Sequence, residues 1–306
     1  MDDFDPRVAA AKPDPASRLA HRLADAHCRI YASAPAGDQI AFMCSSFVRF
    51  TLPHRRQSGY SFERSDGPRV ITFMSPPSIG LPFGKWPRLL LIYLTTQAVR
   101  TRQRDIDLST SMSSFMKCLG ASVTGGATGS IGTFKDQLLR TASMSATLSR
   151  IAPDTARLQN APVADEFAVS WNVVGTDGRS GLPARIRLGE RIFNEMLTAA
   201  VPLDVRAVTA IQQSPLALDL YSWLTFRAYR LRLGSSASIP WADLQNQFGS
   251  AYREQSDFKI AFRSALKQVQ LVYPALRCEA RDAYFVLNYS PTSIAPSAAR
   301  RAARPA

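Results

Sequence analysis

The sequence predicts an α+β protein built from two tandem copies of one small unit. The first observation is repeated spacing: Pro87 to Tyr93 matches Pro215 to Tyr221, and Phe134 and Phe262 lie equally far beyond these prolines. The second is element order, since each half is expected to run helix, short strand, helix, helix, hairpin. Shared order and shared spacing together favour a repeat over coincidence. The third is the length of 306 residues, which suits two domains.

In the first half, helices follow a strand-rich opening. Ser17–Tyr31 has the spacing of a short amphipathic helix, and Ile40–Leu52 and Tyr60–Met74 are predicted to be strands. A buried helix is predicted from Pro87, because Leu89–Leu94 is apolar on every side. The remaining predictions are an extended link at 106–108, helices at 109–120 and 131–142, strands at 146–151, 166–174 and 185–188, and a helix at 190–197.

In the second half, a link over 202–213 leads to helices at 215–233 and 241–249 and then to a helix over Ser256–Tyr273. Ser256 is expected to cap this third helix, and Pro274 ends it. One side of the helix is apolar: Phe258, Phe262, Ala265, Leu266, Val269 and Val272. Leu276–Arg281 and Tyr284–Tyr289 then predict a hairpin. A helix followed by a hairpin is typical of a winged helix, so two tandem winged-helix domains are predicted.

A basic stripe without acidic residues runs beside that apolar side. It comprises Ser256, Lys259, Arg263, Lys267 and Gln270. Arg263 lies at its middle and is the candidate base reader, because an arginine can bond guanine with two hydrogen bonds in the major groove. Lys259 and Lys267 can hold phosphates, and Arg277 and Arg281 of the hairpin can reach the backbone or minor groove. The alternative is a solvated face.

The equivalent helix of the first half is less suited to reading bases. Lys135 and Arg140 point to different sides of it, and Asp136 lies on its outer face. We therefore expect Lys135 and Arg140 to contact backbone phosphates only. The first domain is predicted to supply the main surface of a homodimer.

The charge favours a nucleic-acid partner. The chain carries 37 Lys and Arg against 24 Asp and Glu, a net charge of +13, and acidic membrane is a poorer second candidate. No apolar run approaches the roughly 20 residues of a membrane span, and no signal sequence opens the chain, so a cytoplasmic protein is expected. The cysteines lie far apart, which argues against disulfides and zinc. They are Cys28, Cys44, Cys118 and Cys278.

No catalytic motif is present, so we expect a protein without enzymatic activity or cofactor. A rolling-circle initiator nicks DNA with a tyrosine and a metal held by closely spaced histidines, but His21, His27 and His54 form no such pair. The glycines between 125 and 132 precede no Gly-Lys-Ser/Thr and follow no strand, which argues against a phosphate loop. The predicted boundaries are an N-terminal extension (1–38), two winged-helix domains (39–203 and 204–290) and a disordered basic tail (291–306).

One block resembles a known family. Residues Gly80 to Leu91, followed by Leu94 to Thr101, resemble the plasmid-encoded RepA replication initiators, and the resemblance extends over roughly 40–290. It implies a tandem winged-helix protein that binds direct repeats, called iterons, at a plasmid origin, mainly through the C-terminal domain. It also implies a dimer that represses its own promoter, a monomer that activates the origin, and contacts with the host initiator and replicative helicase. The alternative is a winged-helix transcriptional repressor without initiator activity. We interpret Gly80–Arg88 as a structural segment.

Overall fold

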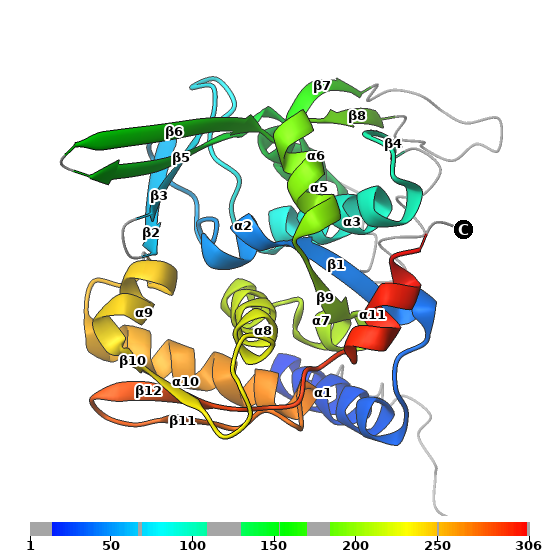
Figure 1. The fold of residues 1–306 in the computed structure, drawn as a ribbon, viewed down its shortest axis with the longest axis vertical. Helices are drawn as coiled ribbons and strands as arrows, with labels where there is room; N and C mark the ends of the chain where they lie inside the picture. Colours follow the sequence, from blue (N-terminus) through cyan, green and yellow to red (C-terminus); the bar gives the residue numbers. More distant parts are fainter. Residues whose placement is uncertain are drawn as a thin grey trace, which may run out of the picture.

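The computed structural model describes residues 14–66, 69–108, 130–152, 154–169, 184–249 and 251–304. Within these ranges the protein is a mixed α/β fold with ten α-helices and four small antiparallel sheets (Figure 1). The elements up to the middle of the chain are α1 (Pro15–Ala32), β1 (Ile40–Cys44), α2 (Ser45–Arg49), β2 (Ser61–Asp66), β3 (Arg69–Met74), α3 (Lys85–Thr101), β4 (Asp105–Asp107), α5 (Ser130–Ser143), β5 (Ser145–Ala152), β6 (Thr155–Pro162), β7 (Ala164–Val169), β8 (Ala184–Leu188) and α6 (Glu190–Thr198). The later elements are β9 (Ala200–Asp204), α7 (Val205–Ile211), α8 (Pro215–Ala228), β10 (Ser236–Pro240), α9 (Trp241–Phe248), α10 (Gln255–Val272), β11 (Cys278–Ala280), β12 (Tyr284–Asn288) and α11 (Pro296–Ala302).

The two halves of the chain contain sheets of the same topology. In the first half the strand order is β4-β8-β7, and in the second it is β10-β12-β11. In both, the strand that follows the first helix pairs with the last strand of the later hairpin, as Ile106 pairs with Ile186 and Ile239 with Phe285. The first half also carries a four-stranded sheet, β2-β3-β5-β6, whose long β5–β6 hairpin projects from the molecule (Figure 1).

The first helix of each half lies in the core. All residues of α3 from Trp86 to Thr96 are buried, and α8 is buried over nearly its whole length. Ser214 caps α8 by accepting a hydrogen bond from the backbone N–H of Ala217, and Pro215 occupies the first helical position. Side chains of α3, α8 and α10 belong to one continuous hydrophobic cluster, so the two halves share a core.

A buried ionic network joins the two halves inside that core. Arg88 of α3 donates from Nε and Nη2 to the two carboxylate oxygens of Asp219 of α8, both at 2.7 Å. Its remaining donors bond the carbonyl oxygens of Leu52, Pro53 and Gly84. His54 donates from Nε2 to Asp219 at 2.7 Å. Because every donor of this guanidinium is bonded, the charge is held inside the protein without an unsatisfied group.

This network makes stability depend on pH. Burial lowers the pKa of His54, which outweighs the raising effect of Asp219. Burial alone would raise the pKa of Asp219, but the Arg88 charge and the hydrogen bonds of His54 and Arg88 bring it below its usual value. As the pH falls, His54 therefore binds a proton in the unfolded chain at a higher pH than in the folded chain. Stability falls as the pH drops below about 6.5. The contribution of the ionised Asp219 to the free energy of unfolding is present above about pH 3.9 and is lost below it.

We expect the free energy of unfolding in urea to decrease from about pH 7.5 to about pH 5. A His54→Gln variant keeps a donor for Asp219 but cannot titrate, so its stability should change less over the same range. An equally steep loss in this variant would show that other groups cause the pH dependence.

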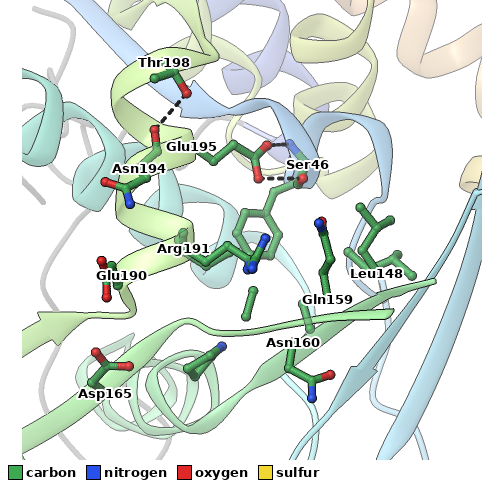
Figure 2. A pocket seen from close by; sticks show the side chains of 16 residues that line it. Ser46, Leu148, Gln159, Asn160, Asp165, Glu190, Arg191, Asn194, Glu195 and Thr198 are labelled. Atoms are coloured by element: carbon green, nitrogen blue, oxygen red, sulfur yellow. Dashed lines mark hydrogen bonds between the residues drawn. The ribbon is translucent and has the colours of Figure 1, made fainter. Parts of the chain in front are cut away.

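Several predicted elements are confirmed, and some are wrong. The helices at 85–101, 130–143, 190–198 and 241–248 and the hairpin after α10 are present where the sequence predicts them, whereas the helix predicted at 109–120 lies outside the described residues. The predicted strand 40–52 stops at Cys44 and continues as α2. Glu195 of α6 is the reason, because its carboxylate accepts hydrogen bonds from the Ser46 backbone N–H at 2.7 Å and from the Ser46 hydroxyl (Figure 2). It also accepts one from the Ser45 hydroxyl.

The prediction of a disordered C-terminal tail is also wrong. Ile294 is 1% exposed and packs with Ile40, Phe42 and Val99 of the first half. The alanines of α11 pack against the same cluster, so a composition rich in Pro, Ser and Ala here forms a docked helix. The N-terminal helix is confirmed as α1, and it packs against α7 and α10. The link predicted at 202–213 instead contains most of β9 and all of α7.

Candidate nucleic-acid interface

The helix α10 is held in place by its apolar side. The six residues predicted to face the core are all buried, as expected from their spacing. Phe262 lies at the centre, with its ring 5.2 Å from that of Trp241 and 5.5 Å from that of Phe285. Tyr273 ends the helix before Pro274, as predicted. The opposite side of the helix is therefore fixed in orientation relative to the hairpin.

Ser256 does not cap this helix, so that prediction is wrong. The helix begins at Gln255, and the cap position belongs to Glu254, whose backbone is extended and whose side chain forms no capping hydrogen bond. Ser256 is then an exposed residue of the first turn. It remains next to the basic stripe.

Two cations of the stripe lie between α10 and the tip of the hairpin. The Lys259 Nζ donates to the carbonyl oxygen of Asp282 at 3.0 Å, and the Arg263 Nη2 lies 3.3 Å from the Asp282 carboxylate. Both charges sit over the ring of Trp241, at 5.4 and 5.7 Å from its centroid. The Trp241 Nε1 in turn donates to the carbonyl oxygen of Arg281 in the hairpin turn. We call Lys259, Arg263 and Arg281 the basic edge.

The other candidates of the second half lie along the same side. Lys267, Gln270 and Arg277 are exposed, and the Gln270 Nε2 approaches the sulfur of Cys278 at 3.7 Å. Burial raises the pKa of the Cys278 thiol to about 11, so the thiol stays neutral. The hydrogen bond from Arg281 to Glu279 raises the pKa of the guanidinium above its usual value. The structure therefore brings the predicted residues of α10 and the hairpin to one side of the fold.

This arrangement can bind a polyanion at small cost. The Arg263 side chain is partly exposed (38%) and the Asp282 side chain is fully exposed, and an ion pair at the surface contributes little to stability. The guanidinium can therefore exchange Asp282 for a phosphate or a guanine edge, both of which accept two parallel hydrogen bonds. The ring of Trp241 keeps the two cations extended toward the hairpin tip.

The two candidates of the first half are not part of this side. Arg140 is 9% exposed, and its guanidinium bonds the Asp136 carboxylate and the carbonyl oxygen of Leu81. It also packs against Gly80, whose φ of 81° favours glycine and whose added Cβ would meet the Arg140 Nη1 at 2.5 Å. The Arg140 side chain therefore braces the segment before α3, and its predicted contact with DNA stays a prediction. Lys135 is half-buried in α5, away from α10 (Figure 1).

A second group of cations, which the sequence did not predict, lies between the two halves. Four arginines line a concavity of about 590 Å³ there: Arg49 of α2, Arg69 of β3, Arg227 near the end of α8 and Arg230 in the turn that follows it. We call it the arginine groove. Arg227 and Arg230 are visible in the sequence as a pair three residues apart, but nothing in the sequence places Arg49 and Arg69 beside them.

Another concavity, of about 800 Å³, lies between α6 and the strands β5 and β6 (Figure 2). Asp165, Glu190 and Glu195 line it together with a single cation, Arg191, so its charge does not suit a phosphate. Among the described residues, no group of three or more His, Cys, Asp or Glu side chains could hold a metal ion. No helix in the described ranges is long and apolar enough to cross a membrane.

Comparison with known proteins identifies the family. The sequence profile of the plasmid-encoded RepA proteins matches residues 81–242, which is more than half of the chain. The chain belongs to this family. Membership of the RepA family supports a role in initiating replication at a plasmid origin, and it implies DNA binding there. The matched segment contains the Gly80–Leu91 block from Leu81 onward, and it ends before α10.

Two solved structures are similar to this RepA-family chain. A crystal structure of domains 2 and 3 of RctB aligns with a TM-score of 0.52 and 14% identity, covering 80% of this chain and 97% of that one. A second crystal structure of RctB domains 2–3 aligns with a TM-score of 0.49 and 15% identity, covering 79% and 95%. At this identity the first similarity concerns the fold alone. No curated protein sequence matches the chain.

Proposed function

We propose that the chain is a plasmid replication initiator that binds iteron repeats at its origin without catalysing a reaction. In this proposal, residues 39–203 and 204–290 act as two winged-helix domains, and the second is the main DNA reader. The bound protein promotes origin opening and loading of the replicative helicase together with the host initiator. A homodimer formed through the first domain represses the promoter of its own gene and is in equilibrium with the active monomer.

The observation that carries this proposal is the basic edge where α10 meets the hairpin turn. A recognition helix needs long donors on one exposed side, and Lys259, Arg263 and Lys267 supply them on α10. The hairpin places Arg281 beside them, where a backbone phosphate flanking the groove would lie. The strand order β10-β12-β11 and its counterpart β4-β8-β7 support two copies of one DNA-binding unit.

A transcriptional repressor with the same interface and no origin function is the alternative. The repeated unit and the RepA family membership favour the initiator. Footprinting of the full chain on DNA flanking its gene distinguishes the two. Regularly spaced direct repeats, protected and left unnicked in the presence of Mg²⁺, would support an initiator without catalysis. A single inverted repeat would support the repressor, and nicking would contradict the absence of catalysis.

Single substitutions on α10 should separate base contacts from phosphate contacts. We expect Arg263→Ala to weaken binding to the cognate repeat by about 1–3 kcal/mol and to relax the preference at one base pair. Lys267→Ala should weaken binding to all sequences alike and lower the slope of log K against log salt by about one. Both effects are measured by titrating the cognate repeat and a random duplex at several salt concentrations.

An Arg157→Ala variant is the matched control, because Arg157 is exposed on the distant β6 and its loss removes the same charge. The proposal predicts a much smaller change for this control. A folded triple variant, K259A/R263A/K267A, with unchanged affinity and unchanged salt slope would place the DNA-reading surface elsewhere.

A further inference from the structure

The arginine groove carries a strong excess of positive charge. Four arginines and one acid, Asp243, line it, so the charged side chains around it sum to +3. Arg69, Arg227 and Arg230 form no ion pair with any other side chain in the described ranges. Burial, and after it the nearby charges of Arg49 and Arg227, lower the pKa of Arg230, as expected where like charges lie close together. Such an arrangement favours binding of an anion.

Guanidinium groups are accessible in the groove, whereas the aromatic rings beneath them are buried. The Arg230 guanidinium lies 3.7 Å from the centroid of the Phe226 ring, and that of Arg227 lies 5.6 Å from the Trp223 ring. Phe226 and Trp223 are only 9% and 4% exposed, so no open aromatic face remains for a base to stack on. Planar guanidinium groups match the oxygen atoms of a phosphate. The groove therefore suits phosphate groups and offers no ring on which a base could stack.

The two walls of the groove are fixed relative to each other. The first half supplies Arg49 and Arg69, and the second half supplies Arg227 and Arg230. Beside them, the Gln247 Nε2 donates to the carbonyl oxygen of Arg49 at 2.8 Å, and Thr51 donates to the carbonyl oxygen of Gln247. Figure 1 shows β2 next to α9. The backbone segments that carry the cations are held in place before any ligand binds, which lowers the entropic cost of binding.

The groove adjoins the basic edge through the start of α9. Pro240 and Asp243 line the groove, and Trp241 lies between them in the chain. The ring of Trp241 lies beneath Lys259 and Arg263 on the other side. A DNA duplex held by the basic edge thus has the arginine groove beside it.

We propose that the arginine groove binds backbone phosphates of the same duplex that α10 reads, outside the bases that α10 contacts. This proposal rests on the proposed function and adds a contact to which both halves contribute. The contact is independent of sequence because only charge and phosphate geometry are recognised. Its strength depends on the relative placement of the two halves, since each half supplies one wall.

The test uses the full chain with Arg227 and Arg230 both changed to alanine. We expect the slope of log K against log salt to fall by about two on the cognate repeat and on random duplex, with an unchanged ratio between the two affinities. The matched control is R18A/R157A, which removes the same charge from exposed positions on α1 and β6. Arg69→Ala, on the opposite wall, should lower the slope by about one. Thermal unfolding establishes that each variant is folded.

A slope equal to that of the control in both R227A/R230A and Arg69→Ala would overturn the proposal. A second arm uses tripolyphosphate alone. If it stabilises the wild type and not R227A/R230A while the DNA slopes stay equal, the groove binds a free phosphate compound instead of DNA.

The outcomes separate the two proposals. Suppose that Arg263→Ala loses its preference for the cognate repeat while the salt slope of R227A/R230A equals that of the control. This result rejects only the proposal that the arginine groove binds DNA. A wild type that does not distinguish repeat from random duplex rejects the proposed function.

Discussion

Replacing Asp219 with alanine is expected to lower the free energy of unfolding by about 3–5 kcal/mol. The substitution leaves Arg88 charged and 2% exposed, with two of its five hydrogen bonds lost. It also removes the acceptor of His54. Burying an unpaired charge costs far more than an exposed pair contributes, so the loss should exceed that of any surface substitution.

The measurement is urea unfolding at neutral pH, followed by circular dichroism. Asp25→Ala is the matched control, because it removes one carboxylate from an exposed pair with Arg29 and should cost less than about 1 kcal/mol. A loss below about 1 kcal/mol for Asp219→Ala would mean that Arg88 finds water or another partner.

Replacing Phe262 with alanine is expected to cost about 3–5 kcal/mol, because it leaves a cavity in the middle of an aromatic cluster. Its ring lies within 6.5 Å of the rings of Trp241, Phe248, Phe258 and Phe285, and the side chain is fully buried. Because Trp241 supports Lys259 and Arg263, the cavity should also weaken DNA binding at temperatures where the variant is folded.

Two variants calibrate this experiment. Phe262→Leu keeps most of the volume and should cost less than about 1.5 kcal/mol. Ile260→Ala, on the same helix, changes a side chain that is 67% exposed and should stay within about 0.5 kcal/mol of the wild type. Equal stability of Phe262→Ala and Ile260→Ala would show that α10 is not held by its apolar side.

The elements that the sequence predicts well are those with local signals. The period of α10 places its six apolar residues in the core, and Pro274 ends the helix, because both effects act within a few residues. The wrong predictions depend on distant partners. The strand predicted through Ser45 is a helix because Glu195, far along the chain, caps it, and the tail is ordered because Ile294 meets a distant cluster.

The candidate site shows the same division. Lys259, Arg263 and Lys267 are predictable together because one helix carries them at regular spacing. Arg140 has the same chemistry, but its burial follows from Asp136 and from the segment at Gly80, which sequence spacing does not place around its guanidinium. The arginine groove draws its walls from both halves, so only the folded chain brings its cations together.

The packing of Ile294 and α11 against the first half has a consequence for synthesis. Ile40, Phe42 and Val99 leave the ribosome long before Ile294, which packs against them. Helix α1 likewise cannot complete its packing until α10, which it contacts, has been translated. Domains usually fold in order as they emerge. Here the nascent chain keeps the apolar surface of Ile40, Phe42 and Val99 uncovered until Ile294 has been translated, so the first half cannot complete its packing before that segment is made.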